Sequence, residues 1–350
     1  MAFGRRLASG IDLGGFSVKV VVVDARKGSP RLIAAESEPV QRDESAGPTL
    51  GPQVAALETI LARLGTRGRA LGRAAIAISG DELTVRQVSL PNLSDHELSN
   101  AIPHEARRHV PLPPETEIAY SYQVISRDAV KGSLELLLGA CPKTLVRDTV
   151  RAVEKIGVSP EFVDAAPIAG LNAILHARAT DESEDEVGFL DVGGAASTLT
   201  LFRTGGFLLS RRIPVGGDTM TREISAKRKM AAAEAEELKR GGPLAHDDAL
   251  LRLVDDSVGR LVAEVKDSIA FFAAKAGRRG LKRLALGGGG ARIAGLAAAI
   301  ERAVGVPVVS VDPAPAFARP ESLSPALASR VGDRLSELSV AFGLTRWWES

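Results

Sequence analysis

Residues 10–24 read Gly-Ile-Asp-Leu-Gly-Gly-Phe-Ser-Val-Lys-Val-Val-Val-Val-Asp, and residues 188–203 read Gly-Phe-Leu-Asp-Val-Gly-Gly-Ala-Ala-Ser-Thr-Leu-Thr-Leu-Phe-Arg. Each stretch contains an apolar strand, an Asp-x-Gly-Gly turn and a second strand rich in β-branched residues. Each then turns again into a third strand, at residues 31–35 and 207–213. Two β-meanders of one plan would rarely arise by chance. The sequence therefore predicts a duplicated α/β protein with one such turn in each half.

The residues of the two turns suit a triphosphate and a metal ion. Glycines let the backbone bring its N–H groups close to an anion, and hydroxyls add further donors. Because an aspartate would repel phosphate, we expect Asp12 and Asp191 to bind a hydrated Mg²⁺. Lys19 follows on the outgoing strand and can reach a phosphate as a point charge. The other expected phosphate-binding residues are Gly14, Gly15, Ser17, Gly193, Gly194 and Ser197.

A third glycine-rich motif lies at residues 284–296, where a short strand runs into four glycines and then into a helix predicted over 295–304. Only glycines let a flat ring or a phosphate lie against the backbone, and a helix N-terminus favours anions. The motif lacks the Gly-Lys-Ser/Thr of a P-loop, and Arg292 stands where a dinucleotide fingerprint needs its last glycine. We expect Gly287, Gly288, Gly289 and Arg292 to contact the nucleotide.

These three motifs, in this order, resemble those of the actin, hexokinase and heat-shock chaperone superfamily. The resemblance implies an actin-like α/β fold, in which two duplicated ribonuclease H-like lobes clamp ATP or ADP with Mg²⁺ between the two phosphate turns. The run Ala235-Glu236-Glu237-Leu238-Lys239 is similar to the FtsA and PilM branch, where an Ala-Glu-x-x-Lys helix contacts the ribose. Glu236 and Lys239 share one helix face at this spacing, although the spacing alone equally fits a solvated pair.

The stretch 83–157 points to the same branch. Ser94 is a helix N-cap before a helix predicted over 97–110, and strands at 118–125 and 134–140 precede a helix at 143–156. This order suggests a small α+β insertion inside the first lobe, which FtsA and PilM proteins carry and actin and sugar kinases do not. The phrase from Leu90 to Pro113 and the segment Ala341-Phe342-Gly343-Leu344 resemble the PilM family in particular.

The resemblance covers essentially the whole chain and implies its division. We expect the first part of the first-lobe core (1A) at 1–83, the inserted 1C-type subdomain at 84–160, a return to the first lobe at 161–189, and the second lobe (2A and 2B) at 190–350 with a C-terminal return to the first. FtsA proteins usually continue into a membrane-binding helix, whereas this sequence stops at Trp347-Trp348-Glu349-Ser350, which favours the PilM family.

Composition is ordinary for a soluble protein and excludes several function classes. The 350 residues are 45% hydrophobic, and 44 basic against 43 acidic residues leave a formal charge of +1, so nothing predicts nucleic-acid binding. The single cysteine, Cys141, excludes an internal disulfide framework and is expected to be a small buried side chain. No targeting segment or membrane-spanning run is visible, so we expect a cytoplasmic protein.

The resemblance implies a cytoplasmic ATP-binding scaffold of type IV pilus assembly, and hence a role in twitching motility. In that family the protein binds the N-terminal peptide of a PilN-type inner-membrane protein, in a groove between the first subdomain and the insert, at the inner face of the membrane. Contacts with pilus motor ATPases and a homo-oligomer are left open. An FtsA-like polymer-forming membrane tether is one alternative. A small-molecule kinase is another, but Asp164, the only carboxylate in the connecting segment, lacks a sugar-binding context.

Rapid hydrolysis is not expected. Hydrolysis of the actin type needs a polar residue that positions a water molecule. The connecting segment Ala165-Ala166-Pro167-Ile168-Ala169-Gly170 offers none. We therefore expect ATP binding with slow or no turnover, with the nucleotide acting as a conformational clamp.

Overall fold

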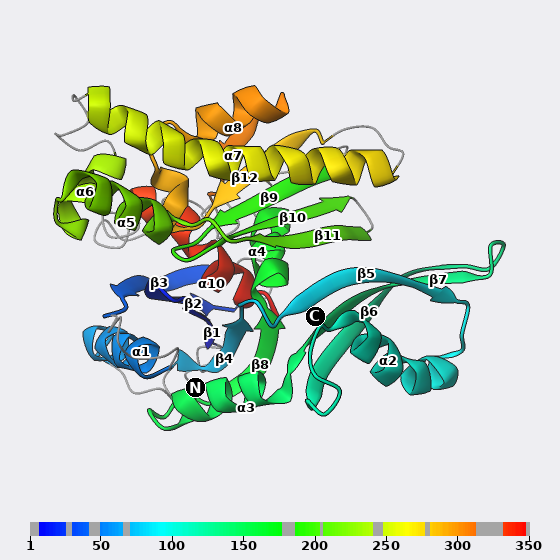
Figure 1. Cartoon of the computed structure of the whole chain (residues 1–350). Helices are drawn as coiled ribbons and strands as arrows, with labels where there is room; N and C mark the ends of the chain where they lie inside the picture. Colours follow the sequence, from blue (N-terminus) through cyan, green and yellow to red (C-terminus); the bar gives the residue numbers. More distant parts are fainter. Residues whose placement is uncertain are drawn as a thin grey trace.

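The computed structural model describes residues 7–25, 30–41, 50–65, 71–176, 186–203, 206–240, 248–276, 281–312 and 332–347. Two sheet-centred lobes lie one above the other, and a smaller sheet projects from the side of the first lobe (Figure 1). Trp348, whose role the sequence leaves open, lies outside the described residues.

The two lobes have sheets with the same strand order. The first sheet runs β3-β2-β1-β4-β8 and the second β11-β10-β9-β12-β13; in both, the first three strands are antiparallel and the last two are parallel additions. The predicted duplication is therefore confirmed. The strands are β1 (Leu7–Leu13), β2 (Ser17–Asp24), β3 (Arg31–Pro39), β4 (Arg73–Ile78) and β8 (Pro160–Ala165), then β9 (Glu186–Val192), β10 (Ser197–Arg203), β11 (Gly206–Ile213), β12 (Arg283–Gly287) and β13 (Val308–Ser310).

Helices cover both sheets and complete their cores. In the first lobe, Leu57 and Ile60 of α1 (Gly51–Arg63) pack with Val20 and Ile76 of the sheet. In the second, Leu261 of α7 (Asp248–Ala276) joins the apolar core. The remaining second-lobe helices are α5 (Gly217–Arg228), α6 (Ala232–Lys239), the 3-10 helix η3 (Gly289–Arg292) and α8 (Leu296–Val304).

The chain returns to the first lobe at its C-terminal end. The 3-10 helix η6 (Gly332–Leu338) leads into α10 (Ser339–Leu344), which packs against β1 and α4 (Ala166–His176). Close approach explains the glycine in this helix: a Cβ on Gly343 would overlap the carbonyl of Ala169 in α4. Helices α4 and α10 therefore lie together between the two lobes (Figure 1).

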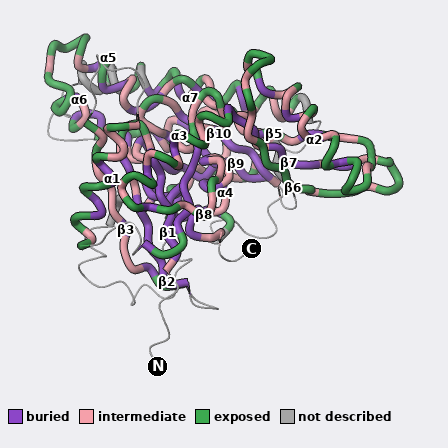
Figure 2. Tube along the Cα trace, turned by 90° about the horizontal axis from the view of Figure 1, so that it is seen from below, coloured by how far each residue is buried: buried purple, intermediate pink, exposed green. Residues whose placement is uncertain are grey.

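The insert is a three-stranded antiparallel sheet ordered β5-β7-β6, with one helix on it. Its elements are β5 (Thr84–Pro91), α2 (Asp95–His109), β6 (Ile118–Asp128) and β7 (Ser133–Pro142). Ser94 caps α2 in a capping box with Glu97, as expected from the sequence. Leu98 and Ile102 of α2 pack on Leu136 and Leu138 of β7. Figure 2 shows β6 and the tip of the β6–β7 hairpin largely exposed, whereas β7 is half-buried to buried like the strands of the lobes.

The helix α3 (Lys143–Glu154) follows the insert but packs elsewhere. Its Val153 is fully buried in the core of the first-lobe sheet, beside Leu57 and Ile76. The insert's own core is formed by α2 and the three strands. By packing, the insert is therefore the sheet and α2, and the division at residue 160 stays a sequence-based prediction.

Candidate nucleotide site

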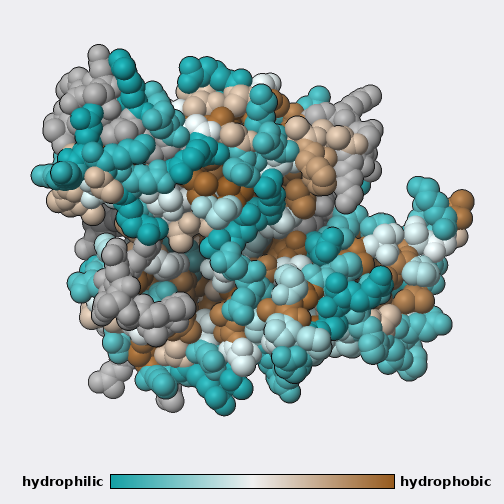
Figure 3. Space-filling view, viewed as in Figure 1, coloured by the Kyte–Doolittle hydropathy of each residue, from teal (hydrophilic) through white to brown (hydrophobic). Residues whose placement is uncertain are grey.

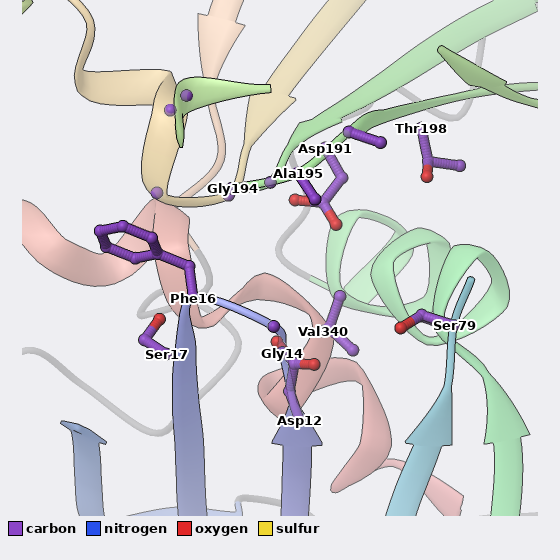
Figure 4. A pocket seen from close by; sticks show the side chains of 18 of the residues that line it. Asp12, Gly14, Phe16, Ser17, Ser79, Asp191, Gly194, Ala195, Thr198 and Val340 are labelled. Carbon is purple, nitrogen blue, oxygen red and sulfur yellow. The ribbon is translucent and has the colours of Figure 1, made fainter. Parts of the chain in front are cut away.

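The two Asp-Gly-Gly turns and the glycine-rich loop line one cavity of about 970 Å³ between the lobes. Figure 4 shows Asp12 rising from the first lobe and Asp191 descending from the second toward the same space. Every nucleotide-site residue expected from the sequence lines this cavity except Ser197 and Gly287. Those present are Asp12, Gly14, Gly15, Ser17, Lys19, Asp191, Gly193, Gly194, Glu236, Lys239, Gly288, Gly289 and Arg292.

Strand register explains how the aspartates come to face the cavity. Asp12 is paired with Lys19 on β2, which in turn is paired with Ser37 on β3. In the second lobe, Asp191 is paired with Thr198 on β10, which is paired with Arg212 on β11. Residues directly opposite in a sheet point to the same face. Two equivalent rows of three residues therefore face each other across the cleft, and all six line the cavity.

Lys19 forms an ion pair with Asp12, its neighbour in the first row. Its Nζ donates to Asp12 Oδ2 at 2.9 Å, and both side chains are only 12% exposed. Burial lowers the pKa of Lys19, but the Asp12 carboxylate outweighs it, and Asp191 and Glu337 add to the upward shift. Lys19 thus stays charged and neutralises one carboxylate beside the place where phosphates would lie.

Among the described residues, Asp191 has no ion pair of its own like that of Asp12, and a cation would fit beside it. Burial first, and then the nearby Asp12 carboxylate, raise the pKa of Asp191 to about 6 against the opposing effect of Lys19. Two carboxylates sharing one ammonium group leave an excess of negative charge in a buried place. A hydrated divalent cation bound by one or two carboxylates plus phosphate oxygens would relieve this excess. Asp12 and Asp191 therefore have the chemistry that a magnesium ion would need.

The glycine-rich loop packs directly on the second turn. Gly288 has a φ of 80°, a left-handed conformation that favours glycine, and a Cβ there would overlap Asp191 and Val192. A Cβ on Gly290 would overlap the Val192 side chain. Gly289, by contrast, has open space where a Cβ would be. The loop consequently presents bare backbone to the cavity at this position.

Glu236 and Lys239 form a buried network between α5 and α6. Lys239 Nζ donates to Gly217 O at 2.7 Å, to Thr221 Oγ1 at 2.8 Å and to Glu236 at 2.5 Å. Thr221 in turn donates to Glu236 at 2.6 Å. Burial lowers the pKa of Lys239, which its neighbour Glu236 partly offsets. The pair is thus not a solvated surface pair; it forms a wall of the cavity.

Two expected residues have other roles. The Ser197 hydroxyl donates to Val215 O at 2.6 Å and is fully buried, so Thr198 takes the cavity-facing position. The second turn has one residue more between its aspartate and its serine than the first, which moves Ser197 to the other face of the strand. Gly287 does not line the cavity. It packs against Phe189 and Ser339, which leave no room for a Cβ.

Comparison with known proteins identifies the family. The family described as type IV pilus assembly protein PilM matches residues 10–345. The chain belongs to the PilM family. A chain of the solved PilM–PilN type IV pilus biogenesis complex is similar over 98% of both chains, with a TM-score of 0.80 at 24% identity.

More distant relatives agree on the fold of this PilM-family chain. The structure of MreB5 of Spiroplasma citri bound to AMPPNP covers 99% of this chain and 97% of its own, with a TM-score of 0.52 and 12% identity. The cell division protein FtsA of Buchnera aphidicola (subsp. Acyrthosiphon pisum) is 24% identical over 65% of this chain. This chain spans 61% of that FtsA and 22% of the FtsA of Bacillus subtilis, which it also matches. The actin-like fold expected from the sequence is confirmed.

Two further expectations concern residues away from the cavity. No helix in the described part of the PilM-family chain is long and apolar enough to cross a membrane. Cys141 is a buried free thiol, and burial raises its pKa to about 11.

Asp164, the candidate catalytic carboxylate of the small-molecule kinase alternative, does not line the cavity. Its Oδ2 accepts a hydrogen bond from Trp347 Nε1 at 3.0 Å, and its Oδ1 accepts one from the Ala165 N–H at 2.7 Å. Trp347 also stacks on Phe162, with ring centroids 5.6 Å apart. Asp164 therefore anchors the C-terminal segment, and nothing in its contacts prepares it to act as a base at a substrate hydroxyl.

Several residues of the cavity wall were not anticipated. Phe16 follows the first glycine pair, Arg212 is the outer member of the second row, and Ser79 comes from the end of β4. Thr200 also lines the wall, and its alternation with Leu199 and Leu201 would have indicated a polar strand face. Ser79 and Arg212 carry no local signal, because only the pairing of distant strands brings them to the cavity.

Proposed function

We propose that this PilM-family chain is an ATP- or ADP-binding scaffold of type IV pilus assembly that holds the N-terminal peptide of a PilN-type membrane protein. The observation that carries the nucleotide part is that both phosphate turns and the glycine-rich loop line one cavity. MreB5 of Spiroplasma citri, which has the same fold, is solved with AMPPNP bound. Asp12 and Asp191 would hold the Mg²⁺, which when bound would offset phosphate charge.

The nucleotide would act chiefly as a clamp between the lobes. Ala166 and Pro167 of the connecting segment line the cavity, and neither side chain can orient a water molecule. Asp164 lies outside the cavity and is engaged by Trp347. Binding energy would therefore stabilise the closed arrangement rather than support rapid turnover.

The partner peptide would bind along the outer strand of the insert. Within the described residues β6 pairs with β7 alone, so its other edge can accept an extended peptide as an added strand. Tyr120, Tyr122 and Val124 alternate along β6 and are 43%, 38% and 36% exposed. Large apolar side chains at this exposure are typical of recognition surfaces. The solved PilM–PilN complex supports a PilN-type partner.

The three exposed side chains lie on one face of the insert. Tyr122 is paired with Leu138 and Val124 with Leu136, and both leucines are buried beneath α2. The helix packs on these leucines, and the face of the insert drawn in Figure 3 shows hydrophobic residues among hydrophilic ones. Because α3 contacts both β6 and β8, this strip lies beside the first lobe. That position agrees with a groove between the first subdomain and the insert.

The test is a fluorescence-anisotropy titration with a labelled N-terminal peptide of the PilN-type protein from the same source, in Mg-ATP. We expect saturable binding, and a loss of affinity of about ten-fold or more in a Tyr120→Ala/Tyr122→Ala variant. The control is Val130→Ala at the hairpin tip, where the side chain is 98% exposed and away from the strip. No binding by the unaltered protein, or equal binding by both variants, would contradict the peptide assignment.

A further inference from the structure

Phe16 is an aromatic side chain placed in a phosphate turn. Its backbone is fixed, because its carbonyl accepts a hydrogen bond from the Val40 N–H at 2.8 Å. The side chain lines the cavity and is 36% exposed. Phe16 is not a member of the buried apolar cores of the described residues. The ring is therefore partly open to the cavity.

The second lobe has no counterpart to this ring. At the matching place after its glycine pair the second turn carries Ala195 and Ala196. Figure 4 shows the Phe16 ring extending away from Asp12, on the opposite side from Ser79. The ring therefore lies toward one end of the cavity. Asp12 and Asp191 lie between it and the end at Ser79.

The described cavity wall also contains aliphatic side chains such as Leu50, Leu209 and Val340, but Phe16 is its one exposed aromatic ring. Glu236, Lys239 and Arg292 are charged, and the loop at Gly289 presents bare backbone. The other phenylalanine of the wall, Phe189, is 1% exposed and belongs to a buried core. An aromatic base stacks on a side-chain ring whatever its hydrogen-bonding edge. Phe16 is the residue of this wall that can provide such a surface from the first lobe.

We propose that Phe16 packs on the nucleoside part of the bound nucleotide and thereby joins the first lobe to a base and ribose held by the second. This inference rests on the proposed nucleotide function and deepens it. The phosphates would be bound by the turns and Lys19, and the nucleoside would be enclosed between the glycine-rich loop and the Phe16 ring. Phe16 would then be a specificity-determining residue that favours nucleotides over bare polyphosphates.

The experiment compares Mg-ATP with magnesium tripolyphosphate by calorimetric titration of the full chain. Phe16→Ala is expected to bind Mg-ATP about ten-fold more weakly, the size of one lost base stack, and to bind tripolyphosphate as the unaltered protein does. Phe16→Tyr is expected to restore ATP binding. Phe271→Ala is the matched control, because Phe271 is 66% exposed on α7 and does not line the cavity. Because stacking tolerates either purine, Mg-GTP is expected to lose as much affinity as Mg-ATP in Phe16→Ala.

Three results would overturn the inference. One is unchanged ATP affinity in Phe16→Ala. A second is an equal loss for ATP and tripolyphosphate, which would make the ring a support for the turn alone. A third is a loss in Phe271→Ala as large as in Phe16→Ala. Absence of ATP binding by the unaltered protein would instead contradict the proposed function, so the two failures are distinguishable.

Discussion

Thr198 is paired with Asp191 in the second lobe at the register position where Lys19 is paired with Asp12 in the first. The two turns are therefore equivalent in backbone and unequal in charge. The first aspartate has an ammonium partner at 2.9 Å, whereas the second faces a neutral hydroxyl-bearing side chain across the strand pair. Because of this asymmetry, the Asp191 carboxylate would remain for a cation when the Asp12 carboxylate is paired with Lys19.

Replacement of Lys19 by methionine should weaken nucleotide binding strongly. The change keeps the length of the side chain but leaves Asp12 and Asp191 without their shared positive charge. Loss of a charged partner in a buried place costs about 1.5–3 kcal/mol, so Mg-ATP affinity should fall by about ten-fold or more. Calorimetric titration measures this, with Lys143→Met as the control because Lys143 is 62% exposed. An unchanged affinity in Lys19→Met would show that the lysine does not face the phosphates.

Replacement of Asp191 by asparagine should stabilise the nucleotide-free protein in a pH-dependent way. Burial raises the pKa of Asp191 from 3.8 to about 6 in the folded state. The folded state then binds the proton more tightly than the unfolded state, so this group's contribution to the unfolding free energy falls as pH rises from about 4 to about 6. At pH 7.5 the variant should be more stable by about 1–3 kcal/mol, and less so at pH 4.5.

Denaturant unfolding at the two pH values measures this difference in the absence of nucleotide and metal. The same variant should lose magnesium-dependent ATP binding, because an amide is a poorer ligand for Mg²⁺ than a carboxylate. A stability gain of the same size at pH 4.5 and pH 7.5 would mean that the pKa of Asp191 is not raised.

Replacement of Trp347 by phenylalanine should destabilise the fold while sparing the nucleotide site. The ring can still stack on Phe162, but Asp164 loses the donor that now opposes the upward effect of burial on its pKa. Loss of one hydrogen bond to a buried carboxylate costs about 1–3 kcal/mol. Thermal unfolding at pH 7.5 should show the loss, and Mg-ATP titration should show none. A kinase that used Asp164 would instead lose ATP turnover in Asp164→Asn, a result this account does not expect.

Replacement of Gly343 by alanine should lower the free energy of unfolding by disturbing the packing of α10 on α4. A Cβ there would overlap the Ala169 carbonyl, and backbone atoms cannot shift cheaply. Overpacking of this kind typically costs about 1–3 kcal/mol or more. The matched control is Gly259→Ala in α7, where a Cβ meets nothing within 4 Å and the loss of a helical glycine should stabilise slightly. Equal unfolding free energies for the two variants would contradict the close packing of α10 on α4.

The sequence was most informative where chemistry and backbone demand the same residues. The repeated Asp-x-Gly-Gly turns predicted two equivalent sheets. In each turn the glycine pair both allows the tight connection between two strands and exposes backbone N–H groups to an anion. It also identified the insert and its Ser94 cap. Ser197 was placed wrongly on the cavity wall because turn length, and not residue type, decides which face of β10 a side chain points to.

Residues contributed by tertiary packing could not be found in this way. Gly287 looks like its neighbours in sequence, yet it is a glycine because Phe189 lies against it. The helix α3 follows the insert in the chain, but its Val153 fills the core of the first lobe. Arg212 reaches the cavity because β11 pairs with β10, and its guanidinium bonds Asp81 of the first lobe at 2.8 Å. Such contacts depend on how distant elements meet, which local patterns do not encode.

A calorimetric titration of Mg-ATP into the unaltered chain and into Asp12→Ala is the most direct test of nucleotide binding by the paired turns. Saturable binding to one site is expected for the unaltered chain and loss of binding for Asp12→Ala, with steady-state phosphate release below about 1 s⁻¹. Absence of binding by the unaltered chain, or equal binding by Asp12→Ala, would contradict a nucleotide clamp built on the paired turns.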